Sequence, residues 1–198
     1  MDTNGNRKLL LPSGGYGKLK SFQIAQLIYD ITVHFVELYV PIESRTRDQM
    51  VQAARFGVQN IAEGSIDAAT SVKLELNLYN VARASLEELR LDYRDYLRQH
   101  NYPIWTKDSI LYQNFIGLRI SDKAGFKSFI RQAESSGAQV NLQRNLYKSF
   151  LVANAVLLLI SSASYFLKRQ IDSKSKKFLE NGGFSERMSL LRKNNRKT

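Results

Sequence analysis

The side chains that could carry out catalysis or bind a metal are few in this sequence, and they are scattered. His34 and His100 are isolated, with no carboxylate at a metal-ligand spacing, and the Glu-x-x-His motif of di-iron helical proteins does not occur. Cysteine is absent, which excludes thiolate metal sites and cysteine nucleophiles. Glu87 and Glu88 are adjacent, so on a helix they point about 100° apart and cannot share one substrate. The sequence therefore predicts a protein that is not an enzyme, with no metal and no cofactor.

Positive charge is the strongest chemical signal in the chain. The net charge is +11, and residues 168–198 hold ten Lys or Arg against three acidic residues, a net +7. Such a surface attracts polyanions, because cations that bind nucleic acid phosphates release condensed counterions. The alternative is a solvated tail that keeps the protein soluble. The candidate nucleic-acid-binding residues are Lys168, Arg169, Lys174, Lys176, Lys177, Arg187, Arg192, Lys193, Arg196 and Lys197.

A second charged pattern lies on the amphipathic segment 74–99. Successive residues of a helix are about 100° apart, and this rotation sorts the segment into three faces. An apolar stripe is formed by Ala82, Leu86, Leu89, Tyr93 and Leu97. One flank of the stripe is basic and the other is acidic. The basic flank holds Arg83, Arg90, Arg94 and Arg98, and the acidic flank holds Glu88, Asp92 and Asp95.

The arginine row has three possible explanations. Like charges four residues apart destabilise an isolated helix by about 0.2–0.5 kcal/mol per pair, so an anionic partner is expected. Glu87 lies in the same wedge and could partly neutralise a solvated face. The basic flank of one subunit could instead meet the acidic flank of the next, in a head-to-tail contact that closes into a ring. The row could also contact phosphates directly.

Four long helices are expected to position these side chains, over residues 18–40, 47–64, 71–100 and 145–180. Each has apolar residues at intervals of three and four. In the first helix they are Ile24, Ile28, Ile31, Phe35 and Leu38, and Pro41 ends it.

The second expected helix has distinctive residues at both ends. Thr46 and Gln49 fit a capping box at its start. Gly57 lies within the apolar face, which predicts a close neighbouring backbone because glycine is unfavourable inside a helix. Gly64 suits a C-terminal cap.

The domain organisation follows from these elements. Residues 1–17 are polar and Gly-rich and are predicted to be flexible. Residues 18–180 are expected to form an all-α, up-and-down four-helix bundle, with 101–142 as a helical insertion between the third and fourth helices. Residues 181–198 form a basic C-terminal tail.

Residues 150–167 are eighteen consecutive residues without a charge, long enough for a transmembrane span. However, Asn154 and three serines interrupt the run, and the central helix of a bundle has a similar composition. We therefore favour a buried helix over membrane insertion. The three leucines before Pro12 are too few for a secretory signal, and we expect a cytoplasmic protein.

The helical hairpin formed by the second and third helices resembles a known family. The matching residues are Gln49, Ala53, Ala54, Asn60, Ile61, Ala62, Glu63 and Gly64, then Leu78, Ala82, Ser85, Leu86, Glu87 and Leu89, and finally Tyr102. They resemble the small four-helix-bundle proteins encoded in 23S rRNA intervening sequences, a family that includes the accessory variability protein of diversity-generating retroelements. The resemblance covers residues 18–102, and the fourth helix only by pattern. The insertion and the basic suffix depart from the compact members, as in a longer branch.

The resemblance implies a cyclic, pentameric assembly that is basic and has no catalytic residues. It also implies that the partner is nucleic acid or a nucleic-acid enzyme such as a reverse transcriptase. We therefore expect a homo-oligomeric adaptor that binds RNA or DNA through backbone charge. The alternative is a protein-interaction scaffold whose basic suffix recognises an acidic protein partner.

Overall fold

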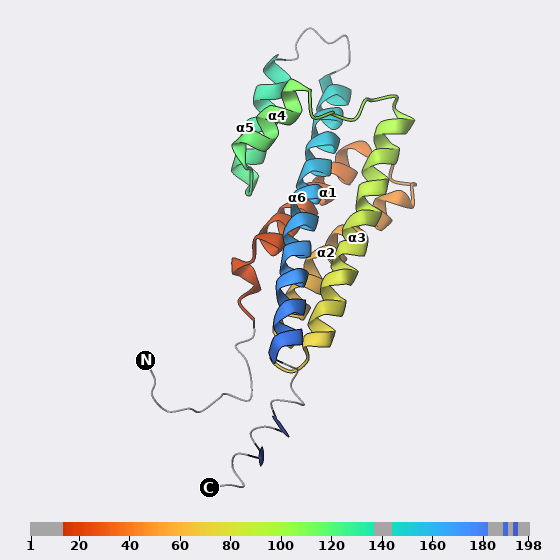
Figure 1. Ribbon diagram of the computed structural model, residues 1–198. Helices are drawn as coiled ribbons and strands as arrows, with labels where there is room; N and C mark the ends of the chain where they lie inside the picture. Colours follow the sequence, from red (N-terminus) through yellow and green to blue (C-terminus); the bar gives the residue numbers. More distant parts are fainter. Residues whose placement is uncertain (1–13, 137–143, 182–187, 190–191, 194–198) are drawn as a thin grey trace.

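The computed structural model describes residues 14–136, 144–181, 188–189 and 192–193 (Figure 1). Across 14–136 and 144–181 the chain forms six α-helices, one short 3-10 helix (Tyr16–Lys18) and no strand. The α-helices are α1 (Lys20–Tyr39), α2 (Thr46–Asp67), α3 (Val72–Gln99), α4 (Ile110–Leu118), α5 (Lys123–Ser136) and α6 (Arg144–Asn181). The all-α class is confirmed.

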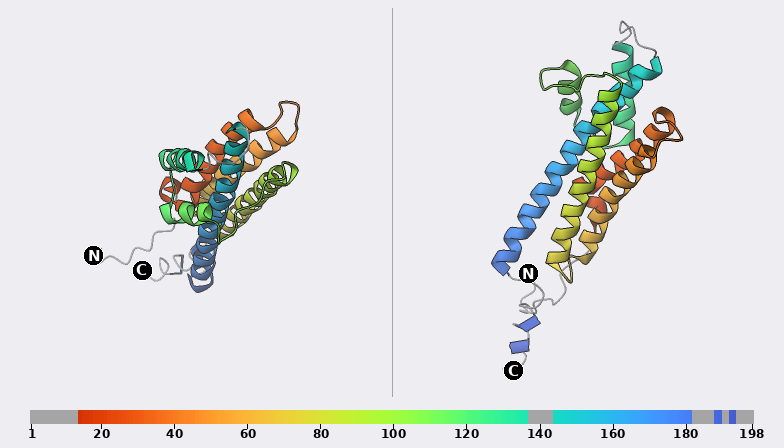
Figure 2. Two further views of the ribbon diagram at one scale, coloured as in Figure 1. Left: turned by 90° about the horizontal axis from the view of Figure 1, so that it is seen from above. Right: turned by 90° about the vertical axis from the view of Figure 1, so that its right-hand side faces the viewer.

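The four longest helices pack lengthwise on one another, as Figures 1 and 2 show. α1 packs on α2 and α6, and α3 packs on the same two helices. The predicted apolar stripe of α3 is fully buried at this junction, with no exposure at any of its five positions. The apolar face predicted for α2 is buried as well.

The uncharged stretch of α6 lies in the core. Leu151, Val156 and Ile160 are completely buried, and α1 and α3 both pack against α6. Among the described residues α6 is also the one helix long and apolar enough to cross a membrane, and 61% of that apolar window is buried within the chain. Burial against neighbouring helices therefore accounts for most of the apolar surface that suggested a membrane span.

The ends of α2 differ from the prediction. Its N-cap is Arg45, with no side-chain hydrogen bond, so the capping box of Thr46 and Gln49 does not form. Gly64 is not the C-terminal cap, because the helix continues to Asp67. It is instead a point of close approach, since a Cβ atom there would lie 3.2 Å from the backbone oxygen of Glu75 in α3.

Gly57 has a related role, with one difference from the prediction. A Cβ at Gly57 would lie 2.9 Å from Cδ2 of Leu86. The close neighbour is therefore a side chain of α3 rather than its backbone. Both glycines allow α2 and α3 to pack closely.

The insertion forms two short helices beside the upper part of α6 (Figure 1). Asn154, a buried polar residue of α6, fixes its start: the backbone N–H of Trp105 donates to Asn154 Oδ1 at 2.8 Å, and Asn154 Nδ2 donates to Pro103 O at 3.2 Å. Aromatic rings extend the contact, with Phe129 of α5 lying 5.0 Å from Phe115 of α4 and 6.1 Å from Trp105, measured between centroids. The insertion is thus attached by hydrogen bonds and aromatic packing.

The predicted terminal segments are described only in part. Of residues 1–17, those before Gly14 lie outside the described residues. Gly14 N–H donates to Ser65 O of α2 at 2.9 Å, and the Ser65 hydroxyl donates to Gly14 O at 3.0 Å. Most of 181–198 also lies outside the described residues. On α1, Leu38 departs from the expected apolar face, because it is 59% exposed.

The packing of α2 on α3 predicts that Gly64→Ala destabilises the protein. The new methyl group would also lie 2.9 Å from the ring of Tyr79, which is buried, and overpacking of this kind costs about 1–3 kcal/mol. The free energy of unfolding, measured by urea denaturation, should fall despite the better helix propensity of alanine. Gly117→Ala is the control, since nothing lies within 4 Å of its Cβ position. Equal stability of both variants would contradict this packing.

Candidate functional site

The C-terminal part of α6 carries the basic residues that the sequence singled out. Lys168, Arg169, Lys176 and Lys177 are exposed there. Lys168 Nζ lies 2.9 Å from Asp172 Oδ2, and Lys176 Nζ lies 3.9 Å from Glu180 Oε1. These pairs link residues one turn apart on an exposed helix, where such pairs contribute little and leave the cations accessible to a ligand.

The other predicted basic residues lie in or beyond this region. The guanidinium of Arg169 lies 5.8 Å from the centroid of the Tyr165 ring. Arg192 and Lys193 are exposed. The three that lie outside the described residues are Arg187, Arg196 and Lys197.

Lys174 differs from its neighbours because it is paired with a buried carboxylate of another helix. Its Nζ lies 2.7 Å from Oε1 of Glu75 on α3, a side chain with only 1% exposure. The hydroxyl of Tyr79 donates to the same oxygen at 3.0 Å. Burial, and then the Glu75 charge, raise the pKa of Tyr79, so this phenol stays protonated as a donor. Glu75 therefore neutralises Lys174 within the chain.

The sequence contains a signal for this pair. Glu75 and Tyr79 extend the apolar stripe of α3 toward its N-terminus at the same spacing of three and four residues. A glutamate on a buried stripe requires a cation or a hydrogen-bond donor, because burying an isolated carboxylate is strongly unfavourable. Which helix supplies this cation or donor depends on which one packs on that end of α3, and the pattern of α3 alone does not specify it.

On the basic flank of α3, two of the four arginines have partners. Arg90 Nε lies 3.0 Å from Glu87 Oε2, which agrees with the proposed neutralisation by Glu87. Arg98 pairs with Asp95 at 3.0 Å, so one member of the acidic flank reaches the basic one. Arg83 and Arg94 make no ion pair with any described residue.

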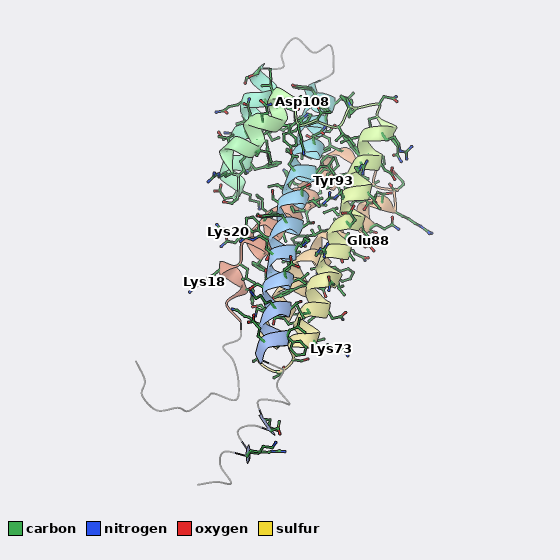
Figure 3. The ribbon with its side chains drawn as sticks, in the orientation of Figure 1. Lys18, Lys20, Lys73, Glu88, Tyr93 and Asp108 are labelled. Carbon is green, nitrogen blue, oxygen red and sulfur yellow. The ribbon has the colours of Figure 1, made fainter. Side chains whose placement is uncertain are left out.

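On the acidic flank, Asp95 is paired with Arg98, whereas Glu88 and Asp92 make no ion pair with any described residue. Partial burial, and then the charges of Asp95 and Glu88, raise the pKa of Asp92 to about 6. Asp92 and Asp95 line a small cavity of about 140 Å³ beside the α1–α2 connection. Glu88 points outward from α3 in Figure 3. The two flanks of α3 thus carry opposite charge, and each has charges without a partner in the described part of the chain.

The described residues contain no group of three or more His, Asp or Glu side chains that could hold a metal ion. His34 lies 3.3 Å from Glu37 on the surface, and Nδ1 of His100 lies 2.8 Å from the backbone oxygen of Tyr96. Each histidine therefore has a local contact on its own helix.

No protein family, curated protein or solved structure matches this chain. The resemblance to the proteins of 23S rRNA intervening sequences consequently stays a prediction.

The buried pair predicts that Lys174→Met destabilises the protein, even though Lys174 lies in the basic segment. The carboxylate of Glu75 would lose its cation while remaining buried, which costs roughly 1–3 kcal/mol. The comparison is with Lys176→Met, whose side chain is 79% exposed and whose loss should leave stability unchanged. Thermal unfolding of both variants would measure the difference, and matching unfolding temperatures would argue against a structural role for Lys174.

Proposed function

We propose that this protein is a non-enzymatic, cytoplasmic adaptor that binds RNA or DNA through the phosphate backbone. In this proposal α1, α2, α3 and α6 form an up-and-down four-helix bundle, and the C-terminal part of α6 with the suffix is the binding surface. The concentration of net charge +7 in residues 168–198 is the observation that carries the proposal. The exposure of Lys168, Arg169 and Lys176 supports it, because these cations are accessible to phosphates.

The structure refines the set of residues that would contact phosphates. Lys174 is best assigned to the fold, because releasing it would leave Glu75 buried without its cation. The remaining cations of the segment lie on an exposed helix and its extension, which suits contact with a backbone rather than base readout. We therefore expect affinity without strong sequence preference. A nucleic-acid enzyme such as a reverse transcriptase is the partner that the family resemblance favours.

We also propose that the protein assembles as a ring through the two flanks of α3. Arg83 and Arg94 on one flank, and Glu88 and Asp92 on the other, lack ion-pair partners among the described residues. The raised pKa of Asp92 shows that a cation beside it would be favourable. A head-to-tail contact supplies that cation and can close into a ring. The resemblance favours five subunits.

Binding to the phosphate backbone predicts a strong dependence on salt. If six phosphates are neutralised, the logarithm of the association constant should fall with the logarithm of salt concentration at a slope of roughly −4 to −5. Reversing Lys176, Lys177, Arg192 and Lys193 together to Glu should abolish binding without dissociating the oligomer. Fluorescence anisotropy with a labelled RNA and a labelled DNA duplex measures the salt dependence and the loss of binding.

A matched control reverses four exposed cations at the other end of the molecule, namely Arg45, Lys107, Lys127 and Arg131. This variant has the same net charge, so retained binding would show that position matters and not charge alone. Affinity that does not change with salt would contradict the mechanism. A partner that stays bound to the protein after nuclease treatment would indicate instead a scaffold for an acidic protein.

The ring contact predicts that Arg83→Glu with Arg94→Glu converts the oligomer to monomers, and that Glu88→Arg with Asp92→Arg does the same. Each pair places like charges across the contact, while both sets are at the surface or half-buried and so tolerate substitution. Mixing the two variants should restore association between unlike subunits, because opposite charges face each other again, although an alternating ring of five subunits cannot close. Analytical ultracentrifugation measures the masses, and an oligomer that survives either reversal would contradict this interface.

A further inference from the structure

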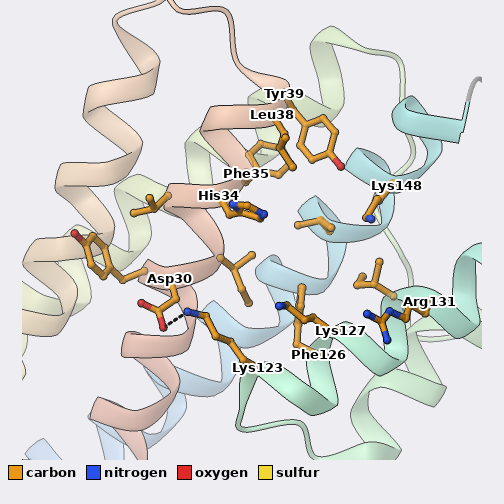
Figure 4. A pocket seen from close by; sticks show the side chains of 15 residues that line it. Asp30, His34, Phe35, Leu38, Tyr39, Lys123, Phe126, Lys127, Arg131 and Lys148 are labelled. Carbon is orange, nitrogen blue, oxygen red and sulfur yellow. Dashed lines mark ion pairs between the residues drawn. The ribbon is translucent and has the colours of Figure 1, made fainter.

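A cavity of about 600 Å³ lies between α1 and α5 (Figure 4). Its apolar wall includes Phe35 of α1, Phe126 and Ile130 of α5, and Val152 of α6. Each of these four side chains is less than 10% exposed to water. The volume is in the range of sites that bind small molecules.

The cavity exists because α5 packs mainly on α6 and much less on α1. α5 packs against α6, whereas the ion pair that joins it to α1 is that of Lys123 Nζ with Asp30 Oδ2, at 2.9 Å. Leu38, which continues the apolar spacing of α1, lines the cavity and is 59% exposed. The apolar face of α1 is therefore longer than the chain itself covers.

Cations surround this apolar wall. Lys127 and Arg131 lie one turn apart on α5, and Lys148 of α6 lines the same cavity, as Figure 4 shows. Lys148 is 3.9 Å from Glu134. Lys127 and Arg131 are exposed and make no ion pair with any described residue. Two unpaired cations therefore stand beside an uncovered apolar surface.

We propose that this cavity binds a medium-chain fatty acid. The aliphatic chain would lie against Phe35, Phe126 and Leu38, and the carboxylate would bind Lys127 and Arg131. Arginine suits this role, because its guanidinium can donate two parallel hydrogen bonds to one carboxylate. Charge complementarity selects the anionic head group, and the apolar wall selects the chain. This site is separate from the basic end of α6 and does not depend on the proposed nucleic-acid function.

The experiment is a calorimetric titration of the full-length protein with dodecanoate below its micelle concentration. We expect saturable binding of one molecule per chain. Decanoate lacks two methylene groups and should bind about fifteenfold more weakly, because each buried methylene contributes about 0.8 kcal/mol, nearly fourfold in affinity.

Two variants test the two halves of the site separately. Lys127→Glu with Arg131→Glu should weaken dodecanoate binding at least tenfold through loss of the head-group contacts. Leu38→Asp should weaken it through loss of chain contact, and its exposure makes the substitution compatible with folding. The charge-matched control is Lys18→Glu with Lys73→Glu, two exposed residues that do not line the cavity (Figure 3), and it should bind like the parent protein.

Several results would overturn the proposal. Equal binding by the cavity variants and by the control would mean that dodecanoate binds elsewhere on a basic protein. An absence of saturable binding, or the binding of many molecules per chain, would also contradict the proposal. If dodecanoate fails but a synthetic amphipathic helix with glutamates on its polar face binds in a manner sensitive to Arg131, the cavity is a groove for an acidic peptide. Circular dichroism of each variant confirms that it is folded.

Discussion

The need to cover α6 determines most of this structure. Its uncharged stretch can leave water only if other helices surround it, and α1, α3 and the insertion do so. Asn154 is a fully buried polar residue on this helix, and its amide is satisfied by the backbone of Pro103 and Trp105. Because a buried amide must be paired, this residue also fixes where the insertion begins. One hydrophobic requirement and one polar exception thus position α1, α3 and the insertion against α6.

Close packing of α2 on α3 has a consequence for the surface. Gly57 and Gly64 let α3 approach, so that its apolar stripe is entirely buried. The arginines lie on one side of that stripe and the acidic residues on the other, a separation that follows from the helix period. The acidic side borders α2, since Asp92 and Asp95 line a cavity together with Thr46 and Met50.

Two cationic regions arise at different places and differ in their surroundings. At the C-terminal part of α6, Lys168, Arg169, Lys176 and Lys177 lie on an exposed helix, which suits contact with phosphates. Beside α5, Lys127 and Arg131 border a wall of buried aromatic and aliphatic side chains, which suits an amphiphile. Lys174 belongs to neither region, because the buried Glu75 holds it in the fold. Local surroundings, rather than charge alone, distinguish these lysines.

The sequence by itself determined the all-α class, the approximate extent of the four long helices and the buried stripe of α3, because helical periodicity and chain-breaking residues are local properties. It placed Glu87 beside Arg90 for the same reason. It did not determine that Gly64 is a packing site and not a cap, that Lys174 meets Glu75 across 99 residues of sequence, or that Leu38 borders a cavity. Each of these depends on which helix lies opposite, and only the tertiary structure decides that, because packing joins segments whose individual patterns contain no information about their neighbours.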